Sequence, residues 1–285
     1  MAETKPAAAK AASSVQAKKG GNAISFIAPI VCIIAGYLIW RFILGNASGF
    51  KEPDVSGAWF WPKHHRPIGD MNKIYEGGII VPFLIGLFLM VIVFSIERFL
   101  TISKAMGAGN ATDFIRKIQY HLANKNIDAA IAECDKQKGS VGNVMKAGLK
   151  KYREMTTESA MDHEQKIGAI QKEVEEATAL ELPMLSKNLV FLSTITSLGT
   201  LIALLGTVLG MIRSFGALGE AGGGGDATAL AIGISEALYN TALGIATSSF
   251  ALIMYNVFTT KIDSITYGID ETSFTLTQSF ATQYK

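Results

Sequence analysis

Four long apolar runs dominate the pattern of hydrophobic and polar positions along this chain. They cover residues 23–45, 78–103, 188–218 and 229–260. A helix needs about 20 predominantly apolar residues to cross the hydrocarbon core of a bilayer, so each run predicts a transmembrane helix. At 1.5 Å per residue each of the last two helices would be roughly 45 Å long, which exceeds a core about 30 Å thick. We therefore expect an all-α integral membrane protein whose last two helices extend from the membrane into a helical bundle.

The segments between the runs are polar and differ in character. Residues 1–22 are rich in Ala, Lys, Gly and Ser without an apolar period, which predicts a disordered tail. Residues 104–187 are hydrophilic with helical spacing of their apolar positions and predict a helical domain. Residues 261–285 predict an amphipathic C-terminal helix. The turn-rich segment 46–77, with three aromatics beside a proline, is expected to lie on the membrane surface, and 219–228 to form a short link.

The basic residues predict how the four helices are oriented. Residues 104–187 contain thirteen Lys or Arg, and the tail before the first run contains four. The link at 219–228 contains none, and the four basic residues of 46–77 are balanced by four acidic ones. Because positive charge is retained on the cytoplasmic side, we expect both termini and 104–187 in the cytoplasm, with 46–77 and 219–228 on the opposite side.

Composition supports a membrane protein and argues against several other classes. Of the residues, 49% are hydrophobic and 18% charged, against about 25% charged in soluble domains. The net charge of +2 does not suggest nucleic acid binding. Cys32 and Cys134 lie in regions of opposite character and are not expected to pair, and the His64–His65 pair is expected in a solvated loop and not at a metal site. With no nucleophile–base pair, metal cluster or phosphate loop, we expect neither an enzyme nor a bound cofactor.

Small and hydroxylated residues recur at steps of three and four along the last two runs. In the third run they are Ser193, Thr196, Thr200, Ala203, Thr207, Gly210 and Ser214. In the fourth they are Gly233, Ala237, Thr241, Gly244, Ser248 and Ala251. Such a stripe favours close packing of membrane helices, especially at its glycines and alanines. The threonines leave a second interpretation open, because a polar pore lining would use the same residues.

Glu236 is an ionisable carboxyl with apolar sequence on both sides, in "GISEALYNTALG". A charged side chain at the centre of a membrane helix costs about 2.5–3.5 kcal/mol on insertion scales. We therefore expect Glu236 to be protonated, hydrated in a cavity or paired with another chain, where it could load and release a proton. The alternative is a neutral Glu236 that bonds Thr207 or Thr241 and locks the helices together.

Two motifs resemble those of a known family. "ALLGTVLGMIRSF" at 203–215 and "AIGISEALYNTALGIATSSFALIMYNVF" at 231–258 are similar to the MotA/TolQ/ExbB proton channel family, most of all to its ExbB members. "ERFL" at 97–100 fits as well, and the resemblance covers roughly 78–260. It implies a homo-pentamer of the Gram-negative inner membrane, whose last two helices line a channel around an ExbD-like single-span partner. Proton flow would then drive a TonB-like protein that energises outer-membrane transport.

The resemblance also implies site residues. Glu236 would be the pore glutamate, and Thr207 and Thr241 the pore threonines. Thr200, Asn240 and Ser214 are further candidates for the pore lining.

The chain departs from the family pattern in its extra first span and in 46–77. A TolQ-like envelope motor and a flagellar-type stator stay open, as does a non-conducting membrane scaffold. The choice between protons and sodium also stays open, with protons implied by the family.

Overall fold

The computed structural model describes residues 21–54, 60, 62, 64–220 and 227–284. The tail predicted at 1–22, the aromatic stretch of 46–77 and the link at 219–228 thus lie largely outside the described residues. The helices of the described part are α1 (Gly21–Leu38), α2 (Asp70–Tyr75), α3 (Ile80–Ala105), α4 (Ala111–Ala123), α5 (Ile127–Gln137), α6 (Gly139–Thr157), α7 (His163–Ser186), α8 (Leu189–Glu220) and α9 (Ala227–Gln283). A π-helical segment η1 (Ile39–Leu44) continues α1, and a 3-10 turn η2 (Ala47–Gly49) precedes strands β1 (Phe50–Glu52) and β2 (His65–Pro67).

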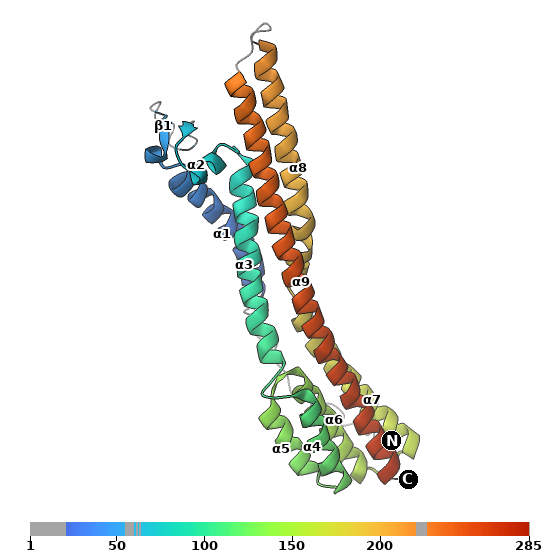
Figure 1. The fold of residues 1–285 in the computed structure, drawn as a ribbon. Helices are drawn as coiled ribbons and strands as arrows, with labels where there is room; N and C mark the ends of the chain where they lie inside the picture. The colour runs from blue at the N-terminus through green and yellow to red at the C-terminus, as the bar shows by residue number, and fades with distance from the viewer. Residues whose placement is uncertain (1–20, 55–59, 61, 63, 221–226, 285) are drawn as a thin grey trace, which may run out of the picture.

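The helices form an elongated molecule with two different ends (Figure 1). At the end that we call the hairpin end, α8 and α9 project past the start of α3. At the opposite end, the bundle end, α4–α7 gather around the last turns of α9. Between the ends, α3 packs against both α8 and α9, and α1 packs against α3.

Four helices of the described residues are long and apolar enough to cross a membrane. They are Ser25–Leu44, Ile80–Ala105, His163–Gly216 and Leu230–Gln283. Each overlaps one of the four apolar runs, so the chain is a helical membrane protein with four candidate spans. The last two candidates extend far into the bundle, since α9 alone has 57 residues and is roughly 85 Å long at 1.5 Å per residue. The boundary expected at residue 260 does not interrupt α9.

The junction between α7 and α8 is a polar break at the bundle end of α3. Asn188 adopts a left-handed backbone conformation with φ 65°, which ends the helical path. Its Nδ2 donates to Glu97 Oε2 at 3.2 Å, and Ser25 Oγ donates to its Oδ1 at 2.7 Å. Arg98 is 2% exposed, is paired with Glu97, and donates from Nη1 to the carbonyls of Met184 and Leu185 at the end of α7. The Glu97–Arg98 pair therefore ties α3 to the break.

A main core holds the bundle end together. At this end its fully buried side chains include Ile118 of α4, Val144 of α6, Ile170 of α7 and Leu276 of α9. Burying a side chain of this size contributes roughly 1.5–3 kcal/mol relative to exposure. This core holds the last turns of α9 in place. Because α9 is one continuous helix, the core also helps to position its membrane part.

A second core lies beside the hairpin end, where the sequence predicted only a surface segment. It contains Trp40, Leu44, Phe50, Tyr75 and Val81. The Trp40 and Tyr75 rings stack 4.4 Å apart, and Trp40 Nε1 donates to the Tyr75 carbonyl at 3.2 Å. The described residues of 46–77 thus pack against η1 and α3 as a small unit.

The all-α fold is confirmed, with one short hairpin added in this unit, and one expectation for the unit is wrong. β1 and β2 pair in an antiparallel ladder with Phe50 opposite Pro67. His64 is not in a solvated loop: it is 7% exposed, stacks on Phe50, and its Nδ1 accepts from the Asp54 backbone N–H at 2.9 Å. The aromatic core explains both results, since it draws the hairpin and His64 out of water.

Candidate functional site

The seam between α8 and α9 is built from small residues. A Cβ added to Gly210 would lie 2.9 Å from the Gly233 carbonyl, and one added to Gly244 would lie 2.6 Å from the Gly199 carbonyl. These distances leave no room for a side chain, so the two backbones touch. The packing interpretation of the glycines is therefore confirmed.

Hydroxyl pairs cross this seam at intervals. Thr207 Oγ1 lies 2.5 Å from Thr241 Oγ1, and each also lies 3.0–3.1 Å from the carbonyl one turn earlier in its own helix. Further toward the bundle end, Thr200 Oγ1 donates to Ser248 Oγ at 3.0 Å. Because a hydroxyl has one proton, Thr207 and Thr241 cannot both donate to their carbonyls and to each other. The pair therefore has alternative donor arrangements, which a proton path requires.

Glu236 has its counter-ion on the same chain. Arg213 Nη1 lies 3.3 Å from Glu236 Oε2, and the two side chains are 56% and 16% exposed. The sequence predicts a protonated, hydrated or intermolecularly paired carboxyl, whereas the structure pairs Glu236 with Arg213 of the same chain. Within the described residues the carboxylate bonds Arg213 and neither Thr207 nor Thr241, so the helix-locking alternative is not what the structure shows.

Glu236 also lies nearer the hairpin end than its apolar flanks suggest. One turn beyond it on α9, Asn240 Nδ2 donates to the Gly77 carbonyl at 3.1 Å, just before α3 begins. At the other end of the spans, Lys261 Nζ lies 5.8 Å from the centre of the Phe99 ring, beside the Glu97–Arg98 pair.

These contacts define two charged layers, one with Arg213 and Glu236 at the hairpin end and one with Lys261 and the Glu97–Arg98 pair toward the bundle end. Asn240 and Lys261 are 21 positions apart on α9, which is roughly 32 Å and close to the thickness of a hydrocarbon core. Glu236 thus sits at the edge of that slab. Its insertion cost is accordingly lower than the value for a central charge.

The other candidates occupy different surroundings. Ser214 is 1% exposed and donates to the Gly210 carbonyl at 3.0 Å, and Asn240 is 2% exposed and packs on Gly206. Both lie inside the subunit, between helices. Thr200 is exposed, and Thr207 and Thr241 are partly buried. The structure thus brings Thr207 and Thr241 together at the seam and directs Asn240 to the start of α3.

Glu76 was not a candidate and belongs to the same neighbourhood. It follows α2, and burial, together with the negative charge of Glu236, raises its pKa from 4.5 to about 7. The sequence held no local signal for this, because Glu76 and Glu236 are 160 positions apart. The contact of Gly77 with Asn240 brings them into one site.

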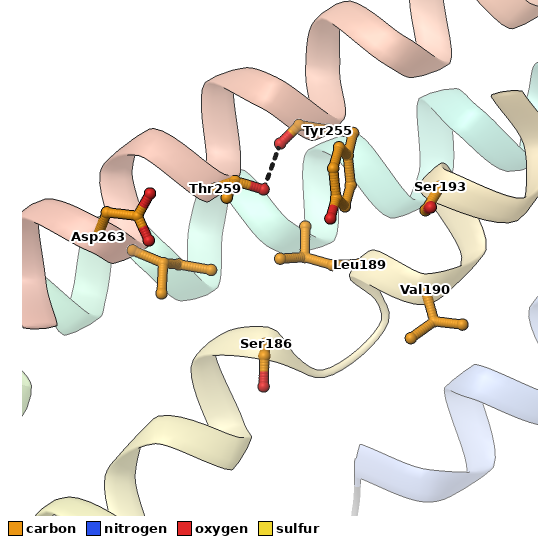
Figure 2. A pocket seen from close by; sticks show the side chains of 8 residues that line it. Ser186, Leu189, Val190, Ser193, Tyr255, Thr259 and Asp263 are labelled. Carbon is orange, nitrogen blue, oxygen red and sulfur yellow. Dashed lines mark hydrogen bonds between the residues drawn. The ribbon is translucent and has the colours of Figure 1, made fainter.

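A pocket of about 390 Å³ opens at the α7–α8 break, far from Glu236 (Figure 2). Figure 2 shows Tyr255 and Thr259 of α9 facing Leu189 of α8, with Thr259 Oγ1 donating to the Tyr255 carbonyl at 2.9 Å. Its surface is mainly apolar, with Asp263 at the edge. Among the described residues that line the pocket, Asp263 has no charged companion, so we assign the functional site to the seam.

Comparison with known proteins finds a family match over the region that contains this seam. Residues 136–271 match the MotA/TolQ/ExbB proton channel family. The chain is 45% identical over 85 residues to the putative biopolymer transport protein ExbB-like 1 of Synechocystis sp., covering 29% of this chain and 34% of that protein. It is 42% identical over 92 residues to the biopolymer transport protein ExbB of Helicobacter pylori, covering 32% of this chain and 62% of that protein.

A third relative carries a different name. The Tol-Pal system protein TolQ of Pseudomonas aeruginosa is 30% identical over 125 residues, covering 44% of this chain and 54% of TolQ. The chain thus matches less than two thirds of each relative's length. The matched family region contains α8 and the part of α9 with Glu236, Thr207 and Thr241. A region of the chain at residues 136–271, which contains the α8–α9 seam, therefore matches the MotA/TolQ/ExbB proton channel family.

Proposed function

We propose that this protein is the channel subunit of a membrane motor that uses the proton motive force. With an ExbD-like single-span partner it would energise TonB-dependent transport across the outer membrane. The observation that carries the proposal is the α8–α9 seam, where the Glu236–Arg213 pair is followed by the Thr207–Thr241 hydroxyl pair within the family domain.

The proposal requires several copies of the chain. One membrane carboxyl per chain cannot relay protons across a bilayer, because a relay needs a series of ionisable groups. A pentamer around a partner with its own acid would supply them. In that assembly the exposed apolar side chains on the far side of α8, such as Leu204 and Val208, would contact lipid or neighbouring subunits.

We place the protein in the inner membrane of a Gram-negative bacterium, with the bundle end in the cytoplasm. The excess of Lys and Arg in 104–187 supports this orientation. The hairpin end, with Glu236 and the unit formed by 46–77, would then face the periplasm. Protons would enter the seam at Glu236 and pass along it toward the bundle.

A TolQ-like envelope motor is the second candidate function, because the match to TolQ is as extensive as the matches to ExbB proteins. The two functions differ in the partner. Copurification with an ExbD-like and TonB-like pair supports the first, whereas a TolR-like partner supports the second. A flagellar-type stator would copurify with neither.

Glu236→Ala tests the proposed function in cells. We expect it to abolish uptake that depends on the proton motive force while the protein still assembles in the membrane. Normal uptake by an assembled Glu236→Ala variant would contradict the proposal and favour a scaffold. Thr207→Val is a milder probe, since a packing seam tolerates this near-isosteric change and a hydrated path does not.

A further inference from the structure

The junction between α2 and α3 forms one wall of the Glu236 site. Gly77 accepts a hydrogen bond from Asn240 at 3.1 Å, and a Cβ on Gly78 would lie 3.1 Å from Arg213 Nη1. Figure 1 shows this junction beside α9, below the tip of the α8–α9 hairpin. The junction precedes the family domain at 136–271. This chain thus adds to the site a segment that the family domain does not contain.

The side chain of Asn240 has a free acceptor in this wall. Its Nδ2 meets the Gly77 carbonyl, and since only the amino group can donate to a carbonyl, the amide orientation is fixed. The Oδ1 atom is buried, and no described residue donates to it. A buried acceptor without a donor is costly, and in native proteins a water molecule commonly supplies the missing hydrogen bond. Asn240 Oδ1 can therefore hold a water beside Gly77.

Glu76 adds a titratable group to this wall, because it precedes Gly77 in the chain and feels the charge of Glu236. Its carboxyl is partly buried, and no described residue forms an ion pair with it. The elements packed around it carry Asp70 on α2 and His65 and Arg66 on β2. The charged groups there with described side chains are Lys73 on α2, Arg41 on η1, Arg213 on α8 and Glu236 on α9. Among these described groups only the charge of Glu236 shifts the pKa of Glu76, which burial has already raised, to about 7. At neutral pH Glu76 can therefore both hold and release a proton.

We propose that Glu76 loads protons onto Glu236 through a water molecule held by Asn240 Oδ1. This inference rests on the proposed function, because it assigns the step that precedes transfer along the seam. Protonated Glu76 gives its proton to the water, and the water gives a proton to the Glu236 carboxylate. Glu76 is left as a carboxylate and is reprotonated from solvent at the hairpin end. Protonated Glu236 is neutral, so its ion pair with Arg213 becomes an ordinary hydrogen bond.

The first test is infrared titration of the full chain in lipid nanodiscs, which follows protonated carboxyl groups directly. We expect a carboxyl band that titrates near pH 7 and is missing in Glu76→Gln. The band should be unchanged in the control Glu52→Gln, which alters an exposed side chain on β1. In Glu236→Gln the same band should titrate at lower pH, because the neighbouring charge is gone. A Glu76→Gln spectrum identical to that of the wild type, or an unshifted band in Glu236→Gln, would overturn the inference.

The second test is proton flux through the complex in liposomes with a pH-sensitive dye inside. Glu76→Gln should lower the flux by about tenfold or more, in line with the loss of a positioned proton-transfer group. Glu76→Asp should restore part of it, and Glu52→Gln should leave it unchanged. If Glu236→Gln abolishes flux while Glu76→Gln conducts normally, the loading role is wrong and the proposed function stands. If Glu236→Gln conducts normally, the proposed function itself fails.

Discussion

The Arg213 guanidinium on α8 lies 3.3 Å from the Glu236 carboxylate on α9, at the edge of the apolar slab. The pair joins the two helices of the family domain just before the Thr207–Thr241 contact. A carboxylate held by a counter-ion is stable when charged, and it can be neutralised when a proton arrives. The ion pair thus gives Glu236 two usable states at one position.

Replacing Arg213 should separate the electrostatic role of the pair from its structural role. Arg213 is 56% exposed, so Arg213→Met should change the free energy of unfolding by no more than about 1 kcal/mol. Proton flux should nevertheless fall, because the charged state of Glu236 loses its partner, and Arg213→Lys should keep most of the flux. Thermal unfolding and liposome flux measure the two effects. If Arg213→Met lowered the unfolding free energy and the proton flux in proportion, the pair would have a structural role only.

The hydroxyl pair of Thr207 and Thr241 can be tested with two single variants and their combination. Each Thr→Val change keeps the shape and removes the hydroxyl, at a cost of about 1 kcal/mol for the lost hydrogen bond. In a conducting seam each single variant should already stop most of the flux, and the double variant should add little. Flux that stays at the wild-type level in the double variant, with assembly intact, would support the scaffold.

The pKa of Glu76 predicts how stability depends on pH. The pKa is raised in the folded protein from 4.5 to about 7, so the folded state binds this proton more tightly than the unfolded state does. Stability therefore falls as pH rises from 4.5 to about 7, and the penalty is complete above that range. One pKa unit corresponds to about 1.4 kcal/mol, so the penalty is at most about 3 kcal/mol, reduced by solvent at the partly exposed side chain.

Glu76→Gln removes this penalty. Its unfolding temperature should exceed that of the wild type at pH 8 and match it below pH 4.5. Tryptophan fluorescence during heating, in detergent at several pH values, measures the difference. A constant offset between the two proteins at all pH values would show that the titration of Glu76 is not responsible.

The close approach of α8 and α9 predicts a strong effect of one methyl group. Gly244→Ala would place a Cβ 2.6 Å from the Gly199 carbonyl and should destabilise the protein by about 1–3 kcal/mol. Gly216→Ala on α8 is the matched control, since its Cβ would meet nothing within 4 Å and alanine favours helix by up to about 1 kcal/mol. Equal unfolding temperatures for the two variants would contradict the tight seam.

The four spans and the seam could be predicted because both depend on local pattern. Apolar runs of sufficient length mark the spans, and steps of three and four mark the glycine and threonine stripe. The β1–β2 hairpin was missed because strands of three residues show too little alternation. The sequence does not show how deep Glu236 lies in the membrane, because α8 and α9 project past α3. The contact of Asn240 with Gly77 reveals this position.

Glu76 and Arg213 could likewise not be predicted as site residues from the sequence. Their importance arises from elements that meet in three dimensions and not from their neighbours in the sequence. The continuity of α9 past residue 260 has a related cause, because no residue there ends a helix and the bundle core supports its last turns.

Proton flux through the reconstituted complex tests most directly whether the α8–α9 seam conducts. Wild type and Glu236→Gln would be compared in the same liposomes at the same protein density, under an imposed pH gradient. We expect rapid acidification with the wild type and a rate near that of empty liposomes with Glu236→Gln. Equal rates for the two proteins, with both complexes assembled, would contradict a proton path through Glu236.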